Sequence, residues 1–187
     1  MSEFSSLLTT RLAPFGILSD AQLALLEAHY RLLLRWNARM NLTRITDLSA
    51  AVELHYCESL FLALHLPAGA LTIGDIGSGA GFPGFPIAVC RPDCEVHLIE
   101  SNARKAAFLR EACSIPNVRV VSKRAEEVND DFDWVVSRAV SVSDFMGLKL
   151  SKCFALLGSA ELTSTYSSAR AVTVPWGSGR SLVMGER

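Results

Sequence analysis

The segment Ile73–Gly84 reads IGDIGSGAGFPG, a glycine-rich turn that directly follows a short apolar run. Glycine combines positive φ angles with a close approach of ligand to backbone, and no other residue allows both so easily. Such a turn opens a helix whose first N–H groups are unpaired and point toward the ligand. The density of glycines argues against a purely structural turn. We therefore interpret the segment as a ligand-binding turn between a strand and a helix.

Two classes of ligand fit this turn. The spacing G-x-G-x-x-G from Gly79 satisfies the dinucleotide fingerprint, whereas D-x-G-x-G-x-G from Asp75 is typical of S-adenosylmethionine (SAM) sites. Glu100, at the end of the next expected strand, suits the ribose hydroxyls of either ligand. A pyrophosphate needs free N–H donors at the start of the helix, and Pro83 and Pro86 remove two of them. SAM has no phosphate, so the sequence favours SAM.

Strand and helix patterns alternate from this region onward, which is the signature of a mostly parallel sheet in an α/β fold. The clearest intervening helix spans Ala103–Ala112, and two late strands are expected over Ala171–Val174 and Ser181–Met184. The other segments with strand patterns are Leu71–Ile76, Glu95–Ile99, Val118–Ser122, Asp133–Ser137 and Phe154–Leu157. Open α/β sheets bind ligands at the carboxyl ends of their parallel strands, so we expect the site there.

Two amphipathic helices are expected ahead of the sheet. Ser19 and Gln22 match a capping box at the start of the first helix. Its buried stripe follows at steps of three and four residues and consists of Leu23, Leu26, Tyr30, Leu33, Asn37 and Met40. The second helix is expected from about Asp47 to Leu66, where Pro67-Ala68-Gly69 breaks it.

A charged repeat runs along another face of the first helix. Glu27, Arg31, Arg35 and Arg39 follow one another at intervals of four residues. One interpretation is a solvated face with a single Glu27–Arg31 ion pair. The other is a ridge that binds phosphates, and spacing alone leaves both open.

The composition limits the class of protein. The chain has 187 residues, 50% of them hydrophobic, and a net charge of −1 at pH 7. This excludes a disordered chain and a disulfide-stapled miniprotein, because enough apolar material is present for a sizeable core. It also excludes a basic nucleic-acid coat, so any contact with RNA or DNA must rely on a local patch.

Cysteine and histidine spacing predicts no metal site. The five cysteines contain no C-x-x-C, the four histidines have no zinc spacing, and scattered cysteines are typical of reduced thiols.

The first residues lack the features of a signal peptide. No apolar run approaches the roughly 18 residues of a membrane span. We therefore expect a cytoplasmic monomer that makes no membrane contact.

Four motifs occur in a fixed order along the chain. They are W-N-x-x-x-N-L-T from Trp36, H-x-x-E-S-L from His55, D-I-G-S-G-A-G-F-P-G from Asp75 and S-R-A from Ser137. Over residues 20–140 the chain resembles the RsmG (GidB) family of bacterial methyltransferases of small-subunit ribosomal RNA. The glycine turn alone is generic, whereas its pairing with the first motif is specific.

The resemblance implies a Rossmann-like SAM-dependent methyltransferase sheet with an N-terminal helical cap. It implies a cap over residues 1–66 and a methyltransferase domain over residues 67–187. It further implies methyl transfer to guanine N7 in 16S rRNA, with that RNA or the small ribosomal subunit as partner. The family usually has Asp where Glu58 stands, and the segment after Leu157 is shorter and more polar than the resemblance implies.

The resemblance also assigns residues to the site by motif position. Around the cofactor it places Gly77, Gly79, Phe82, Glu100, Ala125, Glu126 and Arg138, with Glu100 on the ribose and Ala125 and Glu126 at the adenine. Facing the substrate it places Asn41, His55 and Arg138. No catalytic base is assigned, because guanine N7 carries its own lone pair.

Two rival functions remain open at this point. An NAD-binding oxidoreductase could use the same turn, although no Tyr/Lys or Cys/His arrangement for hydride chemistry is evident. A non-catalytic relative that binds RNA or the ribosome is the other, and the shortened C-terminal part favours it.

Overall fold

The computed structural model describes residues 1–138, 151, 153–159 and 169–186, and these form one sheet with helices around it. The sheet has the strand order β3-β2-β1-β4-β5-β7-β6. Its strands are β1 (Thr72–Ile76), β2 (Glu95–Ile99), β3 (Val118–Val121), β4 (Trp134–Arg138), β5 (Cys153–Ser159), β6 (Arg170–Thr173) and β7 (Arg180–Glu186). Neighbours from β3 to β5 run parallel, and β7 lies antiparallel to β5 and β6. The predicted α/β sheet is confirmed.

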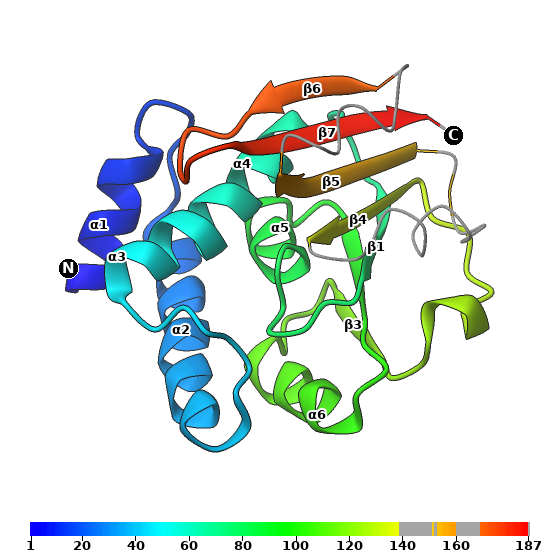
Figure 1. The fold of residues 1–187 in the computed structure, drawn as a ribbon, viewed down its shortest axis with the longest axis horizontal. Helices are drawn as coiled ribbons and strands as arrows, with labels where there is room; N and C mark the ends of the chain where they lie inside the picture. The colour runs from blue at the N-terminus through cyan, green and yellow to red at the C-terminus, as the bar shows by residue number, and fades with distance from the viewer. Residues whose placement is uncertain (139–150, 152, 160–168, 187) are drawn as a thin grey trace.

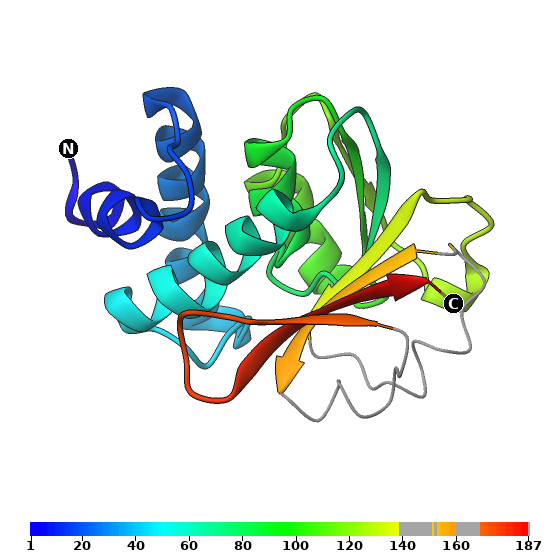
Figure 2. The ribbon, with the colours of Figure 1, turned by 90° about the horizontal axis from the view of Figure 1, so that it is seen from above.

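Helices precede the sheet and connect its first strands (Figure 1). They are α1 (Glu3–Leu12), α2 (Asp20–Met40), α3 (Leu48–Ala51), the π-helical turn η1 (Val52–Cys57), α4 (Glu58–His65), α5 (Gly84–Cys90), α6 (Ala103–Ala112) and the 3₁₀ turn η2 (Ala125–Glu127). Figure 2 shows α1 and α2 at one end of the molecule and the β6–β7 pair running beside α4. Within the described ranges, no helix is both long and apolar enough to cross a membrane.

The first expected helix is present as α2. Ser19 caps it and forms the predicted capping box with Gln22. Leu23, Leu26, Tyr30 and Leu33 of the stripe are buried, while Asn37 and Met40 at its end are half-buried.

Sequence patterns did not indicate α1, whose segment is rich in Ser and Thr. The helix is held by side chains at four-residue intervals, since Phe4, Leu8 and Leu12 are all buried. The Phe4 ring stacks on Tyr30 and meets the edge of Tyr56, with ring centroids 5.0 and 4.9 Å apart. Tertiary packing therefore decides this helix more than local propensity does.

The second expected helix is one helical run with an irregular centre. Asp47 caps its start through a side-chain bond to the Ala50 N–H, and α4 ends at His65. The wide π-helical turn over Val52–Cys57 interrupts it, and this was not predicted. Such turns are rare and concentrate at functional sites.

One core joins the N-terminal helices to the sheet. Buried side chains of α1, α2 and α4 belong to the same cluster as Ile73, Val96 and Leu98 of β1 and β2. The C-terminal hairpin also contributes Trp176 and Leu182 to it. The described β6–β7 hairpin thus packs into the same core as the N-terminal helices, and the boundary between residues 66 and 67 stays a prediction.

Candidate active site

The glycine-rich turn leaves β1 as bare backbone at the carboxyl edge of the sheet. Gly77, Gly79 and Gly81 have φ angles of 69°, 59° and 88°. The Gly77 and Ser78 N–H groups both donate to the Ile99 carbonyl, at 3.0 and 3.1 Å. A Cβ atom at Gly79 would meet nothing closer than the Gly77 carbonyl oxygen at 3.7 Å, so conformation rather than space requires glycine there. The turn therefore offers a fixed and open backbone surface.

Glu100 ties this turn to the start of α6. Its Oε2 accepts a hydrogen bond from the Gly79 N–H at 3.0 Å, and its Oε1 accepts one from the Asn102 N–H at 2.8 Å. The residue is buried. Each carboxylate oxygen has two acceptor positions. The arrangement can therefore accept two further hydroxyl groups without losing its backbone partners.

Asp75 of β1 connects the two ends of the turn, because it bonds to the first residue of α5. It is completely buried, and its Oδ2 accepts a hydrogen bond from the Gly84 N–H at 3.0 Å. Its Oδ1 has no hydrogen-bond partner among the described residues. Burial raises the pKa of Asp75 to about 7. A Cβ atom at Gly84 would lie 2.6 Å from Oδ2, so the contact between β1 and α5 needs glycine.

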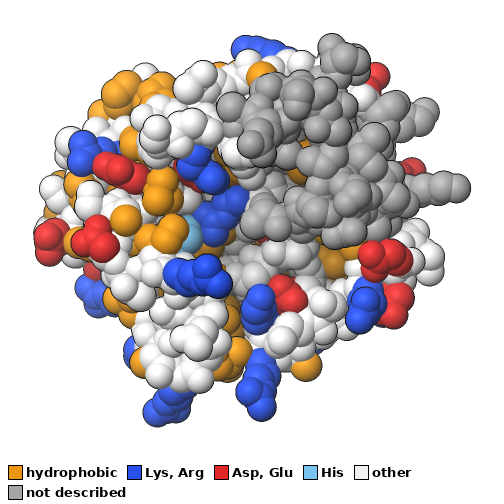
Figure 3. All heavy atoms as spheres, viewed as in Figure 1, with side chains coloured by type: hydrophobic (Ala, Val, Ile, Leu, Met, Phe, Trp, Pro, Cys, Tyr) orange, Lys and Arg blue, Asp and Glu red, His pale blue; other side chains and the backbone are white. Residues whose placement is uncertain are grey.

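Four separate parts of the chain line one cavity of about 270 Å³ beside the turn. Leu42 and Thr43 follow α2, Lys105 comes from α6, and Arg138 ends β4. The turn itself contributes Gly77, Ser78, Gly79, Ala80 and Phe82. Figure 3 shows Lys and Arg side chains gathered near the middle of the face seen in Figure 1. Positive charge is thus concentrated locally on a chain with a net charge of −1.

Arg138 is held by three contacts. Its Nη1 donates to the Leu54 carbonyl and to Nδ1 of His55, at 2.7 Å each. Its guanidinium carbon lies 5.1 Å from the centroid of the Phe82 ring, within the range of a cation–π interaction. Burial lowers the pKa of Arg138 to about 10. The guanidinium therefore remains charged near neutral pH.

His55 is fixed in one tautomer. Arginine can only donate, so Nδ1 of His55 accepts, and Nε2 carries the proton and donates to Oγ1 of Thr43 at 2.9 Å. The ring also stacks on Phe82, with centroids 4.6 Å apart. Burial and the charge of Arg138 lower the pKa of His55 to about 3. The ring is neutral, and both of its nitrogens have partners.

Glu58, the first residue of α4, forms an ion pair with Arg180, the first residue of β7. Glu58 is completely buried, and its two carboxylate oxygens accept from Nε and Nη2 of Arg180, the latter at 2.7 Å. Burial raises the pKa of Glu58, whereas the bonds and charge of Arg180 oppose that shift. Glu58 stands where the family that the sequence resembles usually has Asp. Its longer side chain is accommodated by the two hydrogen bonds with Arg180, the first residue of β7. This pair fixes the helical run of His55 to the C-terminal hairpin.

The structure brings most of the predicted residues together. Gly77, Gly79, Phe82 and Arg138 line the cavity, with Glu100 bonded to the turn and His55 behind Phe82. Asn41 is exposed at the end of α2, with a φ of 49°, next to the cavity residue Leu42. Ala125 packs against the core of the carboxyl edge, and Glu126 is exposed on η2. These three residues are not part of the cavity lining that the structure describes, and their roles stay predictions.

Sequence reasoning missed several contributors. Lys105, in the first turn of α6, belongs to the basic pair Arg104-Lys105, which the sequence offers as a possible RNA contact but to which no role at this cavity was assigned. Leu42 and Thr43 stand inside a quoted motif but received no role. Arg180 gave no local signal, because it lies 122 residues from its partner Glu58. Ala139, the last residue of the S-R-A motif, lies outside the described residues.

Comparisons with known proteins identify the family of the chain. Residues 22–165 match the model of the family GidB, described as rRNA small subunit methyltransferase G. A protein of that name from Chromobacterium violaceum is 42% identical over 137 residues, which cover 70% of this chain and 65% of the relative. The one from Nitrosospira multiformis is 39% identical over 149 residues, covering 76% and 68%. The chain thus spans about two thirds of the length of these relatives.

Solved structures are similar in fold. A SAM-dependent methyltransferase from Aquifex aeolicus superposes with a TM-score of 0.58 at 16% identity, covering 77% of this chain and 95% of that one. A chain of a fibrillarin/Nop5p complex gives a TM-score of 0.54 at 10% identity, covering 72% and 81%. At these identities the likeness shows the Rossmann-like methyltransferase fold alone.

Proposed function

The chain belongs to the GidB family of rRNA small subunit methyltransferase G, and on that premise we propose that it transfers the methyl group of SAM to N7 of a guanine in 16S rRNA. The observation that carries the proposal is that the glycine turn and Arg138 line the same cavity. We further propose that it acts as a cytoplasmic monomer on this RNA or on the small ribosomal subunit.

The residues of the turn fit SAM better than a dinucleotide. The first N–H groups of α5 are already used, since Gly84 donates to Asp75 and Phe85 donates to the Gly81 carbonyl. Pro86 has no N–H to offer. A pyrophosphate would therefore lack donors at this helix start, which argues against the oxidoreductase alternative. Gly77 and Gly79 would lie against the cofactor, and Glu100 would accept hydrogen bonds from its ribose hydroxyls.

The described side chains suit a reaction that needs no proton abstraction. SAM, when bound, supplies an electrophilic methyl group on its sulfonium. Neither His55 nor Glu58 is available as a base, because both nitrogens of His55 are occupied and Glu58 is paired with Arg180. Guanine N7 has a lone pair and loses no proton first. The work left to the protein is alignment, which can supply roughly 7–11 kcal/mol of a barrier.

Arg138 and Phe82 are the residues to which we assign that alignment. They form one wall of the cavity, and the bonds of Arg138 to Leu54 and His55 fix the guanidinium over the ring. Because this wall and the glycines of the turn line the same cavity, the cofactor and the base would meet beside a fixed guanidinium.

One experiment tests the proposal directly. The purified chain is incubated with SAM and with 16S rRNA or small subunits from cells that lack this methyltransferase. Mass spectrometry of the digested RNA should then show one new N7-methylguanine. Binding of SAM and RNA with no methylated product would instead support the non-catalytic relative that binds RNA or the ribosome. Binding of NAD in place of SAM would overturn both.

A further inference from the structure

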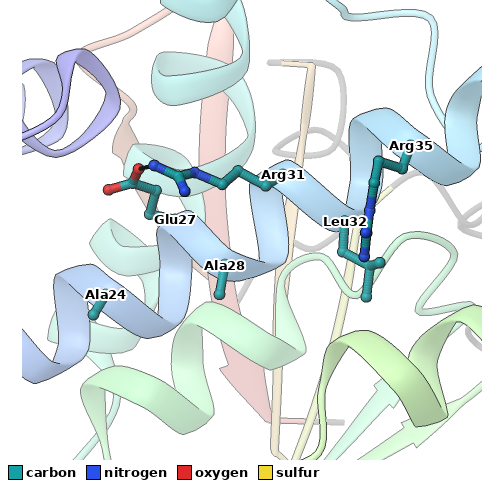
Figure 4. Close-up of a pocket in the computed structure, with 6 residues that line it drawn as sticks. All are labelled: Ala24, Glu27, Ala28, Arg31, Leu32 and Arg35. Carbon is teal, nitrogen blue, oxygen red and sulfur yellow. Dashed lines mark hydrogen bonds and ion pairs between the residues drawn. The ribbon is translucent and has the colours of Figure 1, made fainter.

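A groove runs along one side of α2. Two adjoining cavities of about 570 and 650 Å³ share Leu32 and Arg35. The first extends back to Ala24, and the second extends forward to Met40 and across to Glu111 of α6. Figure 4 shows Ala24, Ala28 and Leu32 along the helix, with the Arg35 side chain lying beside Leu32. Small and apolar side chains therefore alternate in the groove with three arginines and with the carboxylates of Glu27 and Glu111.

The three arginines of the charged repeat differ in how they are engaged. Arg31 is paired with Glu27, which also accepts hydrogen bonds from Ser2 and Ser5 of α1 (Figure 4). Arg35 and Arg39 form no ion pair with any other residue that the structure describes. Both are exposed, and four helical residues correspond to a rise of about 6 Å between them. Two cations are thus available to a ligand, and the third is partly neutralised.

The end of the groove and the candidate active site are lined by neighbouring residues of the chain. Trp36 lines its second part, held by a hydrogen bond from Nε1 to Glu111 at 3.1 Å and by edge contact with Phe108. After Met40 the chain passes directly to Leu42 and Thr43, which line the cavity beside the glycine turn. A ligand that followed α2 would therefore reach the mouth of that cavity.

We propose that this groove binds the sugar–phosphate backbone of a single-stranded segment of the substrate RNA, with Arg35 and Arg39 on its phosphates. The inference rests on the proposed function. An enzyme that modifies one base needs that base out of its stack, so nucleotides next to it are single-stranded at the cavity mouth. Arginine presents a planar fork that matches phosphate oxygens in pairs. Arg35 and Arg39 lie on the part of α2 that leads to the cavity residues Leu42 and Thr43, and this placement favours the RNA substrate of the proposed function over an acidic protein segment.

The test measures the affinity of the chain for protein-free 16S rRNA from cells lacking the methyltransferase, between 50 and 200 mM salt. Each phosphate contact steepens the fall of log K with log salt by about 0.7–0.9, which corresponds to roughly 2.6- to 3.5-fold in affinity between 50 and 200 mM salt. Arg35→Gln and Arg39→Gln should each lower the slope by that amount, and Arg31→Gln should lower it less. Arg35→Lys should retain the slope, because it keeps the charge.

Two controls separate this inference from the proposed function. Arg170→Gln removes an exposed arginine from the edge strand β6, away from α2, and should leave the slope unchanged. SAM affinity, measured by calorimetry, should be the same in every variant. Unchanged slopes in Arg35→Gln and Arg39→Gln, in a chain that still methylates rRNA, would overturn the RNA groove. The RNA groove would also be overturned if Arg35→Gln and Arg39→Gln lost binding to intact small subunits but kept the wild-type affinity for free rRNA. That result would indicate a protein partner instead. A wild type that methylates nothing refutes the proposed function instead.

Discussion

Nη1 of Arg138 and Nδ1 of His55 lie 2.7 Å apart, in a hydrogen bond that can run in one direction only. Since arginine donates, His55 must accept, and its other nitrogen must donate to Thr43. The side chain of Thr43, which follows α2, is thereby connected through one neutral ring to the last residue of β4. The cavity wall is consequently set by contacts that join the N-terminal helices to the sheet.

Gly79→Val should abolish SAM binding while the fold survives. A β-branched side chain resists the φ of 59° that Gly79 adopts, and it would also cover the exposed backbone of the turn. Calorimetry should show no heat of SAM binding, and circular dichroism should match that of the wild type. Wild-type SAM affinity in a folded Gly79→Val chain would rule out the turn as the cofactor site.

The ion pair between Glu58 and Arg180 gives a prediction on stability. Glu58 is completely buried, so Glu58→Gln should cost about 3 kcal/mol of unfolding free energy, the lower end for a broken buried pair, because Arg180 is 29% exposed. Urea unfolding measures this cost. As a matched control, Arg11→Gln breaks the more exposed pair with Glu53 and should cost less than about 1 kcal/mol. Equal costs for both variants would contradict the structural role of the buried pair.

The sheet and the site differ in how far local sequence could predict them. Predicted strand boundaries fall within one residue of the observed ones for β1 to β4, because short apolar runs bounded by turn residues carry their own signal. Glu100 was predictable for the same reason, since it follows directly on β2. The π-helical turn and the position of Arg180 depend on contacts between segments far apart in the sequence. No window of the sequence contains both partners of such a contact, so packing alone decides them.

Asp75 should make stability depend on pH in an unusual direction. Its pKa is about 7 in the folded chain against 3.8 as the ordinary value, so the folded state binds the extra proton between these limits. Stability is therefore lost as the pH rises from about 4 to 7, by on the order of 4 kcal/mol for a shift of this size. Asp75→Asn removes that loss, because an amide does not ionise.

The measurement for Asp75 is urea unfolding of both proteins at several pH values. Relative to the wild type, the Asn variant should gain stability steadily from pH 4 to pH 7. His29, whose pKa burial lowers to about 4, acts in the opposite sense in both proteins, since its contribution is lost as the pH falls below 6.5. Comparing the two proteins cancels that effect. Parallel stability curves would mean that the Asp75 carboxyl does not carry the raised pKa.

The last prediction concerns the role of His55 in methyl transfer. If the acceptor is guanine N7, His55 positions Arg138 and takes no proton. His55→Ala should then slow single-turnover transfer by up to about two orders of magnitude through misalignment. His55→Asn, whose amide oxygen can still accept from Arg138, should recover part of the rate.

Because the pKa of His55 is about 3, its titration lies far below the range from pH 6 to 9. The profile of each variant should therefore have the same shape as that of the wild type when SAM and RNA are saturating. A rising limb in the wild type that disappears in His55→Ala would identify His55 as a general base and would point to an acceptor other than N7.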